Sequence, residues 1–385
     1  MVAENTTQPG GVMIIAGETS GDHHGALLVA AMRKIDGDLT FFGIGGGAMK
    51  REGVDVIVDA DSLSVVGITE VFSRIPSILR GISNIKRAVV ARKPGLVILI
   101  DFPDFNLHIA KYVKRFSIPV LYYISPQLWA WRLGRIKKIR KYVTRMAVIL
   151  PFEKAFYSNH GVPVSFVGHP LLDCHSVESY DAFLSQRIMG KTVIGLLPGS
   201  RNQEVSRNLP TMLAAASQIN RKSDNISFVV SVAPGININD IDEYILPYRN
   251  VLDIRTASGD IETVLTQCTL VVAVSGTVTL ESAIHGVPMV IVYQVSPVSY
   301  MFGCALIRVE HIGLANIIAG ERVVPELIQG DATPARIART VSEIIRDPVR
   351  LGETRKKLRM VRDQLGGPGA SRRTAGIAYS MMRQT

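Results

Sequence analysis

The sequence predicts an α/β protein made of two successive open sheets of parallel strands, and three observations predict this fold class. Short apolar runs that end at turn residues alternate with helical stretches from end to end of the chain. This alternation stops after residues 167–170, where polar residues extend to Lys191. The chain has 385 residues, more than one ordinary core accommodates. Ligands are therefore expected where the carboxyl ends of the strands face a cleft.

The elements of the two domains can be placed in chain order. Apolar runs predict strands at residues 12–16, 40–43, 96–100, 120–124 and 147–150, with helices at 22–35 and 75–93 among them. A second series of strands follows at 192–197, 226–232, 270–274 and 289–293, and the end of the chain predicts helices rich in Arg. We therefore expect a disordered polar N-terminus over 1–11, a first domain over 12–175, a second over 190–350 and C-terminal helices over 351–385.

Composition indicates a folded protein of a reducing compartment. Hydrophobic residues make up 47% and charged residues 20% of the chain, and its three cysteines are far apart and without metal-ligand spacing. The first eleven residues lack the pattern of a signal peptide, and no apolar run approaches the roughly 18 residues of a membrane span. We expect a cytoplasmic protein with no metal, because the acidic pairs Asp36 and Asp38, and Asp59 and Asp61, are common chance patterns in turns.

Positive charge is concentrated in the first domain. The net charge of the chain is +10, and between Ser62 and Arg145 there are 16 Lys and Arg against three acidic residues. Such a concentration indicates a polyanionic partner, either nucleic acid or an anionic membrane surface. A solvated helix face is the alternative interpretation.

Two stretches of this basic region combine cations with apolar or aromatic side chains. The first has more apolar residues than one buried helix face needs: Val65, Val66, Ile68, Val71, Phe72, Ile75, Ile78 and Leu79. The second places cations beside two tryptophans: Arg132, Arg135, Lys137 and Lys138. Aromatic side chains next to cations suit a membrane interface, so we predict both sets as membrane contacts. The alternative is that the apolar residues face the core and the basic face is solvated.

Two carboxylates follow the buried strand at 96–100. Asp101 comes directly after the strand, where it can face the cleft, and it is our candidate general base. Asp104 lies at the start of the next helix and is better explained as its N-cap. A structural role for Asp101 remains the alternative.

The second domain contains two turns suited to a nucleotide sugar. In the first, a strand runs into Gly199, Ser200 and Arg201 before a helix, and helix N–H groups with an Arg fork suit a diphosphate. Arg201 would stabilise charge on a departing nucleotide, whereas Glu204 either contributes to the site or ties the loop together. The second turn contains Ser275, Gly276 and Thr277, and Glu281 on the following helix can accept two ribose hydroxyls. For the first turn, the alternative interpretation is an ordinary helix start with Arg201 on the protein surface.

These stretches together resemble lipid-A-disaccharide synthases, a family of glycosyltransferases. The matching residues are 16–22 (AGETSGD), 101–106 (DFPDFN), 123–131 (YISPQLWAW), 168–171 (GHPL), 197–201 (LPGSR), 275–281 (SGTVTLE) and 314–316 (LAN). The resemblance implies a GT-B architecture of two Rossmann-like domains facing a cleft, with C-terminal helices returning to the N-terminal domain. It further implies that the first domain binds the acceptor and the second the donor. Residues 297–313 align poorly, so donor contacts there stay open.

The resemblance also implies the reaction and its partners. UDP-2,3-diacylglucosamine would give its sugar to the 6-hydroxyl of 2,3-diacylglucosamine 1-phosphate with inversion, without a metal or cofactor, at the inner face of the inner membrane. A homodimer is left open, and no nucleic acid is expected. Asp101 matches the general base, and Arg201, Glu281 and Asn316 match residues of the nucleotide site.

The turn after the first strand then has a function on the acceptor side. Its glycines suggest a phosphate loop, but a phosphate loop would not carry two carboxylates. We therefore assign Glu18 to the acceptor hydroxyl, as a group that orients it or assists Asp101, and Asp22 to the first turn of the helix. The other residues predicted on the acceptor side are Gly17, Ser20, Gly21, Gln127 and Trp129.

Three alternatives remain beside this prediction. Another UDP-sugar enzyme of GT-B architecture, such as a peptidoglycan N-acetylglucosaminyl transferase or a UDP-sugar epimerase, would share the donor site. The basic segment would also suit a nucleic-acid-binding protein, although no module of that kind is visible. A nicotinamide-dependent oxidoreductase would need a G-x-G-x-x-G turn after the first strand, which Gly17 and Gly21 do not supply.

Overall fold

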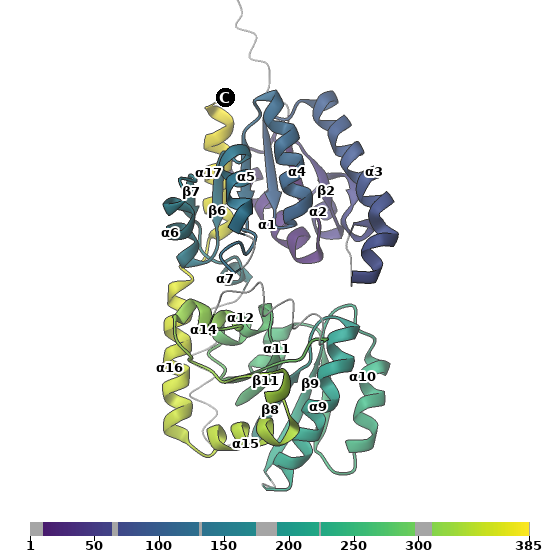
Figure 1. Ribbon diagram of the computed structural model, residues 1–385, viewed down its shortest axis with the longest axis vertical. Coiled ribbons are helices and arrows are strands. Elements are labelled where there is room, and N and C mark those ends of the chain that lie inside the picture. Colours follow the sequence, from purple (N-terminus) through teal and green to yellow (C-terminus); the bar gives the residue numbers. More distant parts are fainter. Residues whose placement is uncertain are drawn as a thin grey trace, which may run out of the picture. The chain divides into compact units, whose positions relative to one another are not determined.

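The structure is a computed structural model that describes residues 11–63, 68–130, 133–174, 191–222, 225–296 and 310–384; the side chains of residues 19, 68–75 and 133 are not described. The chain forms two compact units, one of residues 1–173 and 366–385 and the other of residues 174–365 (Figure 1). Each unit contains one parallel sheet, so the predicted class of two open α/β sheets is confirmed. The predicted disordered N-terminus lies outside the described residues except at Gly11.

The first unit is built around a seven-stranded sheet in the order β3-β2-β1-β4-β5-β6-β7. Its central strands, β1 (Val12–Ala16) and β4 (Leu96–Ile100), are buried along their whole length, which their continuous apolar runs predict. The remaining strands are β2 (Phe41–Gly45), β3 (Asp55–Asp59), β5 (Val120–Tyr123), β6 (Arg145–Val148) and β7 (Val164–Phe166). Since all the strands are parallel, their carboxyl ends share one edge of the sheet.

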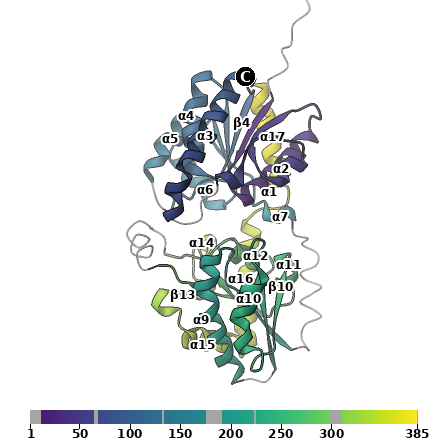
Figure 2. The ribbon, with the colours of Figure 1, turned by 90° about the vertical axis from the view of Figure 1, so that its right-hand side faces the viewer.

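Helices cover both faces of this sheet (Figure 2). One face is covered by α3 (Ile68–Arg92), α4 (Pro103–Val113) and α5 (Ile136–Tyr142), the other by α1 (Thr19–Arg33), α2 (Gly47–Arg51) and α17 (Ala370–Arg383). Two further helices, α6 (Pro151–Asn159) and α7 (Leu171–Cys174), follow β6 and β7. Met13 and Ile15 of β1 share a core cluster with residues of α3 and α4, because alternate side chains of a strand face the same side of the sheet.

The second unit is also built around a parallel sheet, which has six strands in the order β10-β9-β8-β11-β12-β13. Its strands are β8 (Thr192–Leu197), β9 (Ile226–Val232), β10 (Ile254–Ser258), β11 (Leu270–Val274), β12 (Met289–Tyr293) and β13 (Glu326–Ile328). Its helices are α9 (Asn202–Asn220), α10 (Ile238–Ile245), α11 (Ile261–Leu265), α12 (Thr277–Ile284), α14 (Leu314–Ala319), α15 (Pro334–Ile345) and α16 (Pro348–Gln364). Apolar residues of β8, α9 and α15 form its main core cluster.

The strands that the sequence did not predict are β3, β7, β10 and β13, which flank the predicted ones. They are the edge strands of the two sheets, and β3, β7 and β10 are only partly buried. Partly exposed strands alternate polar and apolar residues instead of forming a continuous apolar run, so the pattern that identified the central strands did not identify them.

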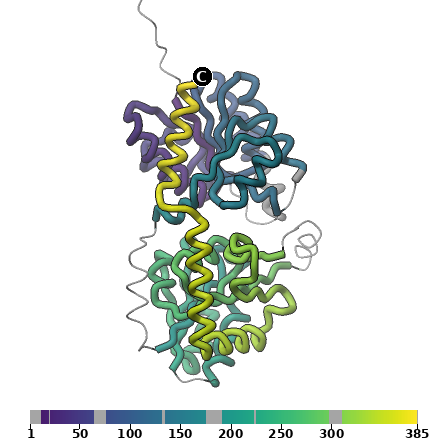
Figure 3. The backbone as a smooth tube through the Cα atoms, turned by 90° about the vertical axis from the view of Figure 1, so that its left-hand side faces the viewer, coloured from purple at the N-terminus to yellow at the C-terminus, as the bar shows by residue number. Residues whose placement is uncertain are grey.

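The C-terminal helices return to the first unit later than predicted. α16 packs on α12 and α14 of the second unit, whereas α17 packs on α1 of the first (Figure 3). The predicted boundary at residue 351 is therefore wrong, and the return begins at Gly366. Gly366 and Gly369, with φ of 83° and 101°, break the helix there, and the Asp173 carboxylate accepts hydrogen bonds from the first N–H groups of α17.

Candidate active site

The turn after β1 lies against the residue that follows the candidate base. A side chain at Gly17 would place its Cβ 2.3 Å from the ring of Phe102, so glycine is required for the two turns to approach each other. Glu18, the N-cap residue of α1, is exposed, and so is Ser20. The structure therefore brings the turn after β1 and the turn after β4 together, as the sequence predicts for carboxyl ends of parallel strands.

The Asp101 backbone is held in an uncommon conformation. Asp101 and Phe102 have φ of 44° and 45°, in the left-handed region that costs non-glycine residues free energy. Two buried side chains hold this turn through the Asp101 carbonyl oxygen, which accepts hydrogen bonds from Asn106 Nδ2 at 2.6 Å and from the Tyr122 hydroxyl at 2.5 Å. Asn106 also donates to the carbonyl of Ile100. These contacts fix the backbone of Asp101, from which its side chain extends.

Burial, together with the nearby Glu18 carboxylate, raises the pKa of Asp101 to about 6. A hydrogen bond from the Phe102 N–H lowers the pKa and offsets part of this effect. A carboxylate with a pKa near neutral is mostly ionised at pH 7 and still basic enough to accept a proton from a hydroxyl. The arrangement thus fits a general base.

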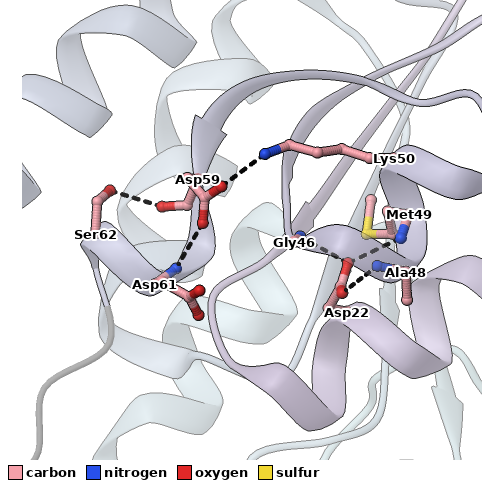
Figure 4. Close-up of polar contacts among 8 residues, drawn as sticks. All are labelled: Asp22, Gly46, Ala48, Met49, Lys50, Asp59, Asp61 and Ser62. Carbon is pink, nitrogen blue, oxygen red and sulfur yellow. Dashed lines mark hydrogen bonds and ion pairs between the residues drawn. The ribbon is translucent and has the colours of Figure 1, made fainter.

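The carboxylate of Asp22 binds the start of a neighbouring helix (Figure 4). Its buried carboxylate accepts hydrogen bonds from the N–H groups of Gly46, Ala48 and Met49, at 2.6, 2.8 and 3.0 Å, at the start of α2. The free N–H groups at the start of α2 are therefore satisfied by a side chain of the first turn of α1. Asp22 lies in the first turn of α1 as predicted, but its carboxylate stabilises α2.

The acidic pairs of the first unit have local roles. Asp59 binds Lys50 Nζ at 2.7 Å and accepts a hydrogen bond from the Asp61 N–H (Figure 4). Asp36 likewise accepts one from the Asp38 N–H. Within the described part of the chain, no group of three or more His, Cys, Asp or Glu could hold a metal ion.

Two predictions about the helix α4 and its surroundings need correction. Phe102 is the N-cap of α4, and Asp104 lies in its first turn with Pro103 before it, because Asp101 and Phe102 are held in the left-handed region. Asp104 forms an ion pair with Arg135, whose side chain is only 13% exposed. Arg135 is therefore less available to a membrane than we predicted, whereas Lys137 and Lys138 are exposed. Arg132 lies outside the described residues.

The second unit contains a pocket of about 570 Å³ at the carboxyl ends of its strands. Its lining includes most of the predicted donor residues: Gly199, Ser200, Arg201, Glu204, Ser275, Gly276, Thr277 and Glu281. Sequence reasoning missed other lining residues, which lie at or just after the ends of β9, β10 and β12: Ala233, Pro234, Gly259, Asp260, Ile261 and Tyr293. The position of these residues at or just after strand ends was the available signal, and two of those strands were predicted.

Glu204 organises the glycine loop of this pocket. Its Oε2 accepts a hydrogen bond from the Ser200 N–H at 2.9 Å, and its Oε1 lies 3.6 Å from Arg201 Nη1. Gly199 has φ of 119°, and a Cβ there would lie 2.5 Å from the Glu204 carboxylate. Glu204 therefore ties the loop together, which was the alternative that the sequence left open. Arg201 keeps 60% of its side chain exposed at the pocket.

Asn316 is placed behind the pocket and does not line it. It is fully buried, and its Nδ2 donates to the Val324 carbonyl at 2.9 Å and to Glu326 Oε1 at 2.8 Å. Glu326 also accepts hydrogen bonds from the Ile312 and Gly313 N–H groups. In this structure the Asn316 amide bonds within the protein and supports the segment at 312–313, and its assignment to the nucleotide site stays a prediction.

Two parallel α/β units, one with the candidate base Asp101 and the other with a glycine and arginine pocket, define the GT-B class of fold. Solved structures with this fold include UDP-GlcNAc 2-epimerase from Neisseria meningitidis bound to UDP-GlcNAc (TM-score 0.62, 12% identity, 96% of this chain and 99% of that chain). Acinetobacter baumannii MurG is similar as well (TM-score 0.61, 14% identity, 97% and 100%). At such low identity these structures show the fold alone.

The sequence comparisons are more specific. The family model of lipid-A-disaccharide synthetase (LpxB) matches residues 12–380. The lipid-A-disaccharide synthase of Geobacter sulfurreducens is 46% identical over 384 residues, which cover 99% of each chain. That of Syntrophus aciditrophicus is 45% identical over 379 residues, covering 97% of this chain and 98% of the relative. The chain therefore belongs to the lipid-A-disaccharide synthase family, a family of glycosyltransferases, and the predicted resemblance is confirmed.

Proposed function

We propose that the chain transfers a diacylated glucosamine from UDP-2,3-diacylglucosamine to the 6-hydroxyl of 2,3-diacylglucosamine 1-phosphate. The products are the β-1′,6-linked disaccharide 1-phosphate and UDP. The observation that carries this proposal is the carboxylate of Asp101, on a backbone held in position and with a pKa of about 6, because an inverting transfer needs one general base. Family membership identifies the substrate class.

The reaction is a single in-line displacement. Asp101 accepts the proton of the acceptor 6-hydroxyl while that oxygen attacks the anomeric carbon on the face opposite to UDP. The bond between the anomeric carbon and the diphosphate breaks, and its electron pair passes to the leaving UDP. Arg201 and the N–H groups of its loop stabilise the charge that develops on the diphosphate. Asp101 then returns the proton to water.

The other predicted residues contribute to binding in this proposal. Glu281, Ser275, Gly276 and Thr277 line the pocket where the ribose and diphosphate of UDP would lie. Glu18 orients the acceptor hydroxyl beside Asp101. Gly17 and Gly21 allow the backbone and its neighbours to approach closely, since a Cβ at Gly21 would lie 3.3 Å from that of Ala16.

The assay that tests the proposal uses the purified protein with both diacylated sugars. We expect release of UDP together with a disaccharide monophosphate, identified by mass spectrometry. UDP-N-acetylglucosamine, the substrate of the alternative transferase and epimerase, serves as the control donor and should give neither transfer nor epimerisation. Absence of UDP release from the diacylated pair would refute the proposal.

We expect the pH dependence of kcat/KM to follow the ionisation of Asp101. The base must be deprotonated to act, so kcat/KM should be low in acid, rise with pH through about 6 and level off above it. Glu18→Gln should move the midpoint to lower pH, because it removes a negative charge that raises the pKa of Asp101. Glu52→Gln, at the C-terminal end of α2, is the control and should leave the midpoint unchanged, because Glu52 is not among the groups that shift this pKa.

We further propose that α3 and α4 rest on an anionic membrane surface, from which the enzyme takes its acylated substrates. A groove of about 530 Å³ along α3 is lined by apolar residues together with Lys86 and Arg87. Leu79 and Val90 in this groove are 60% and 50% exposed. Exposed apolar side chains beside cations favour an interfacial location. In the part of the chain that the structure describes, no helix combines the length and apolar character of a membrane span.

Part of the predicted membrane set cannot be placed in this groove. Val65 and Val66 lie outside the described residues, as do the side chains of four further members: Ile68, Val71, Phe72 and Ile75. Ile78 is partly buried and packs against the core of the first unit, so it fits the core-facing alternative. Leu79 is the described member of the apolar set that is exposed as the membrane prediction requires.

Replacing Lys86 and Arg87 together with Ala should weaken binding to vesicles of phosphatidylglycerol and phosphatidylethanolamine about 30-fold, since each cation near an anionic surface contributes about 1 kcal/mol. Sedimentation with vesicles measures this, and the difference should shrink at high salt. The matched control replaces the exposed cations Lys34 and Arg51, which belong to the opposite face of the sheet, and should keep binding intact. Equal binding by the two double variants would contradict the proposal.

A further inference from the structure

A buried carboxylate lies beneath the loop that follows β5. Glu153, in the first turn of α6, is only 1% exposed. Its Oε2 accepts a hydrogen bond from the Leu150 N–H at 3.1 Å, and its Oε1 accepts one from Trp129 Nε1 at 3.3 Å. Trp129 belongs to the loop at residues 124–130, so Glu153 connects this loop to the start of α6.

Other contacts hold the same loop at several points. The Ser125 hydroxyl is 2.6 Å from that of the buried Tyr157, and Leu128 is inserted into the core of the first unit. The ring of Trp129 meets that of Phe152 edge-on, with centroids 4.9 Å apart. Between these anchors, Gln127 is exposed.

The loop begins directly beside the candidate base. β5 is the neighbour of β4 in the sheet, and Ile100 pairs with Tyr123 in their register. The Asp101 N–H donates to the Tyr123 carbonyl at 3.3 Å, and the Tyr122 hydroxyl donates to the Asp101 carbonyl. Because the loop starts beside Asp101, a displacement of the loop would change the protein surface next to the candidate base.

A carboxylate is a costly side chain at this buried position. Burial raises the pKa of Glu153 to about 7, which shows that the ionised form is disfavoured by its surroundings. An apolar residue would fill the same space at a lower cost in the free energy of folding. The donors that meet Glu153 belong to the Trp129 loop and to the start of α6, so the carboxylate serves to join these two segments.

We propose that Glu153 is a positioning residue for the acceptor: it fixes Trp129 and thereby the loop that starts beside Asp101 and carries the exposed Gln127. This inference rests on the proposed function, in which the first unit binds the acceptor. Glu153 does not itself touch the acceptor, because it is buried under the loop. Its removal should therefore affect acceptor binding and leave the binding of the donor unchanged.

The test compares Trp129→Phe and Glu153→Gln with the wild type. Trp129→Phe keeps an aromatic ring against Phe152 but loses the N–H that bonds to Glu153. Because leaving a buried hydrogen-bond acceptor without its donor costs about a tenfold change in an equilibrium constant, we expect about a tenfold rise in acceptor KM and in the acceptor dissociation constant measured by calorimetry. Donor KM should stay within about twofold of the wild-type value.

Val162→Ala is the matched control for a merely structural effect. Val162 lies in the same core cluster beyond the end of α6, so its truncation should lower the melting temperature without changing acceptor KM. If Glu153→Gln does not fold, the acceptor KM and dissociation constant of Trp129→Phe alone decide whether the positioning role holds.

The outcomes separate this inference from the proposed function. A wild type that converts the acceptor while Trp129→Phe keeps an unchanged acceptor KM and affinity would overturn only the positioning role. A rise of acceptor KM in Val162→Ala equal to that in Trp129→Phe would also overturn it. A wild type that neither binds nor converts the acceptor would overturn both proposals.

Discussion

Replacing Asp101 with Asn should lower turnover by roughly 10²–10⁴-fold, the contribution expected of a general base. The amide has nearly the shape of the carboxylate but does not accept the proton of the attacking hydroxyl. Asn also adopts the left-handed backbone that Asp101 requires, with φ of 44°, more readily than most residues. The variant should therefore fold normally, and its loss of activity should appear in kcat with little change in either KM.

Asp104→Asn is the matched control for this experiment. Asp104 lies three residues further on, in the first turn of α4, and its carboxylate is 78% exposed and paired with Arg135. Because the Asp104 carboxylate is itself largely exposed, Asn can replace it with little change in the site, so this variant should keep near-normal turnover. Near-normal turnover in Asp101→Asn, with the melting temperatures of both variants unchanged, would remove Asp101 from the role of base.

Local patterns in the sequence were sufficient to predict the central part of each sheet. Strands such as β1, β4 and β11 are buried on both faces and consist of five apolar residues each, a pattern typical of the middle of a parallel sheet. The partly exposed edge strands, such as β3 and β10, carry no such pattern. The return of the chain at Gly366 depends on Asp173, which is far away in the sequence, so local reasoning placed it too early.

The candidate site shows the same distinction between local and distant partners. Asp101 and the loop at 199–201 follow buried strands directly, so their position could be predicted from the strand pattern alone. The roles of Asp22 and Asn316 depend on partners in other elements, namely the start of α2 and Glu326 of β13. Glu153 was not singled out, because its partner Trp129 comes from the loop after a different strand. Such pairings arise from tertiary packing, which no short stretch of sequence encodes.

Arg201→Ala should lower kcat/KM for the donor by about 10- to 100-fold. A charge-assisted hydrogen bond contributes about 1.5–3 kcal/mol, and each 1.36 kcal/mol changes a rate or an affinity tenfold. The guanidinium is largely exposed at the pocket and 3.6 Å from Glu204, so it is held near the loop and remains available to a diphosphate. Arg201→Lys keeps the charge but loses the planar fork, so its activity should be intermediate.

Arg207→Ala provides the matched control on the same helix. Arg207 lies on an exposed face of α9 and is not among the residues that line the pocket, so its removal should leave donor kinetics unchanged. Unchanged donor kinetics in Arg201→Ala as well would mean that the loop at 199–201 does not hold the diphosphate.

The kinetic parameter that changes in Arg201→Ala also distinguishes two roles of Arg201. A rise in KM alone indicates contact with the bound donor, whereas a fall in kcat indicates that Arg201 stabilises charge as UDP departs.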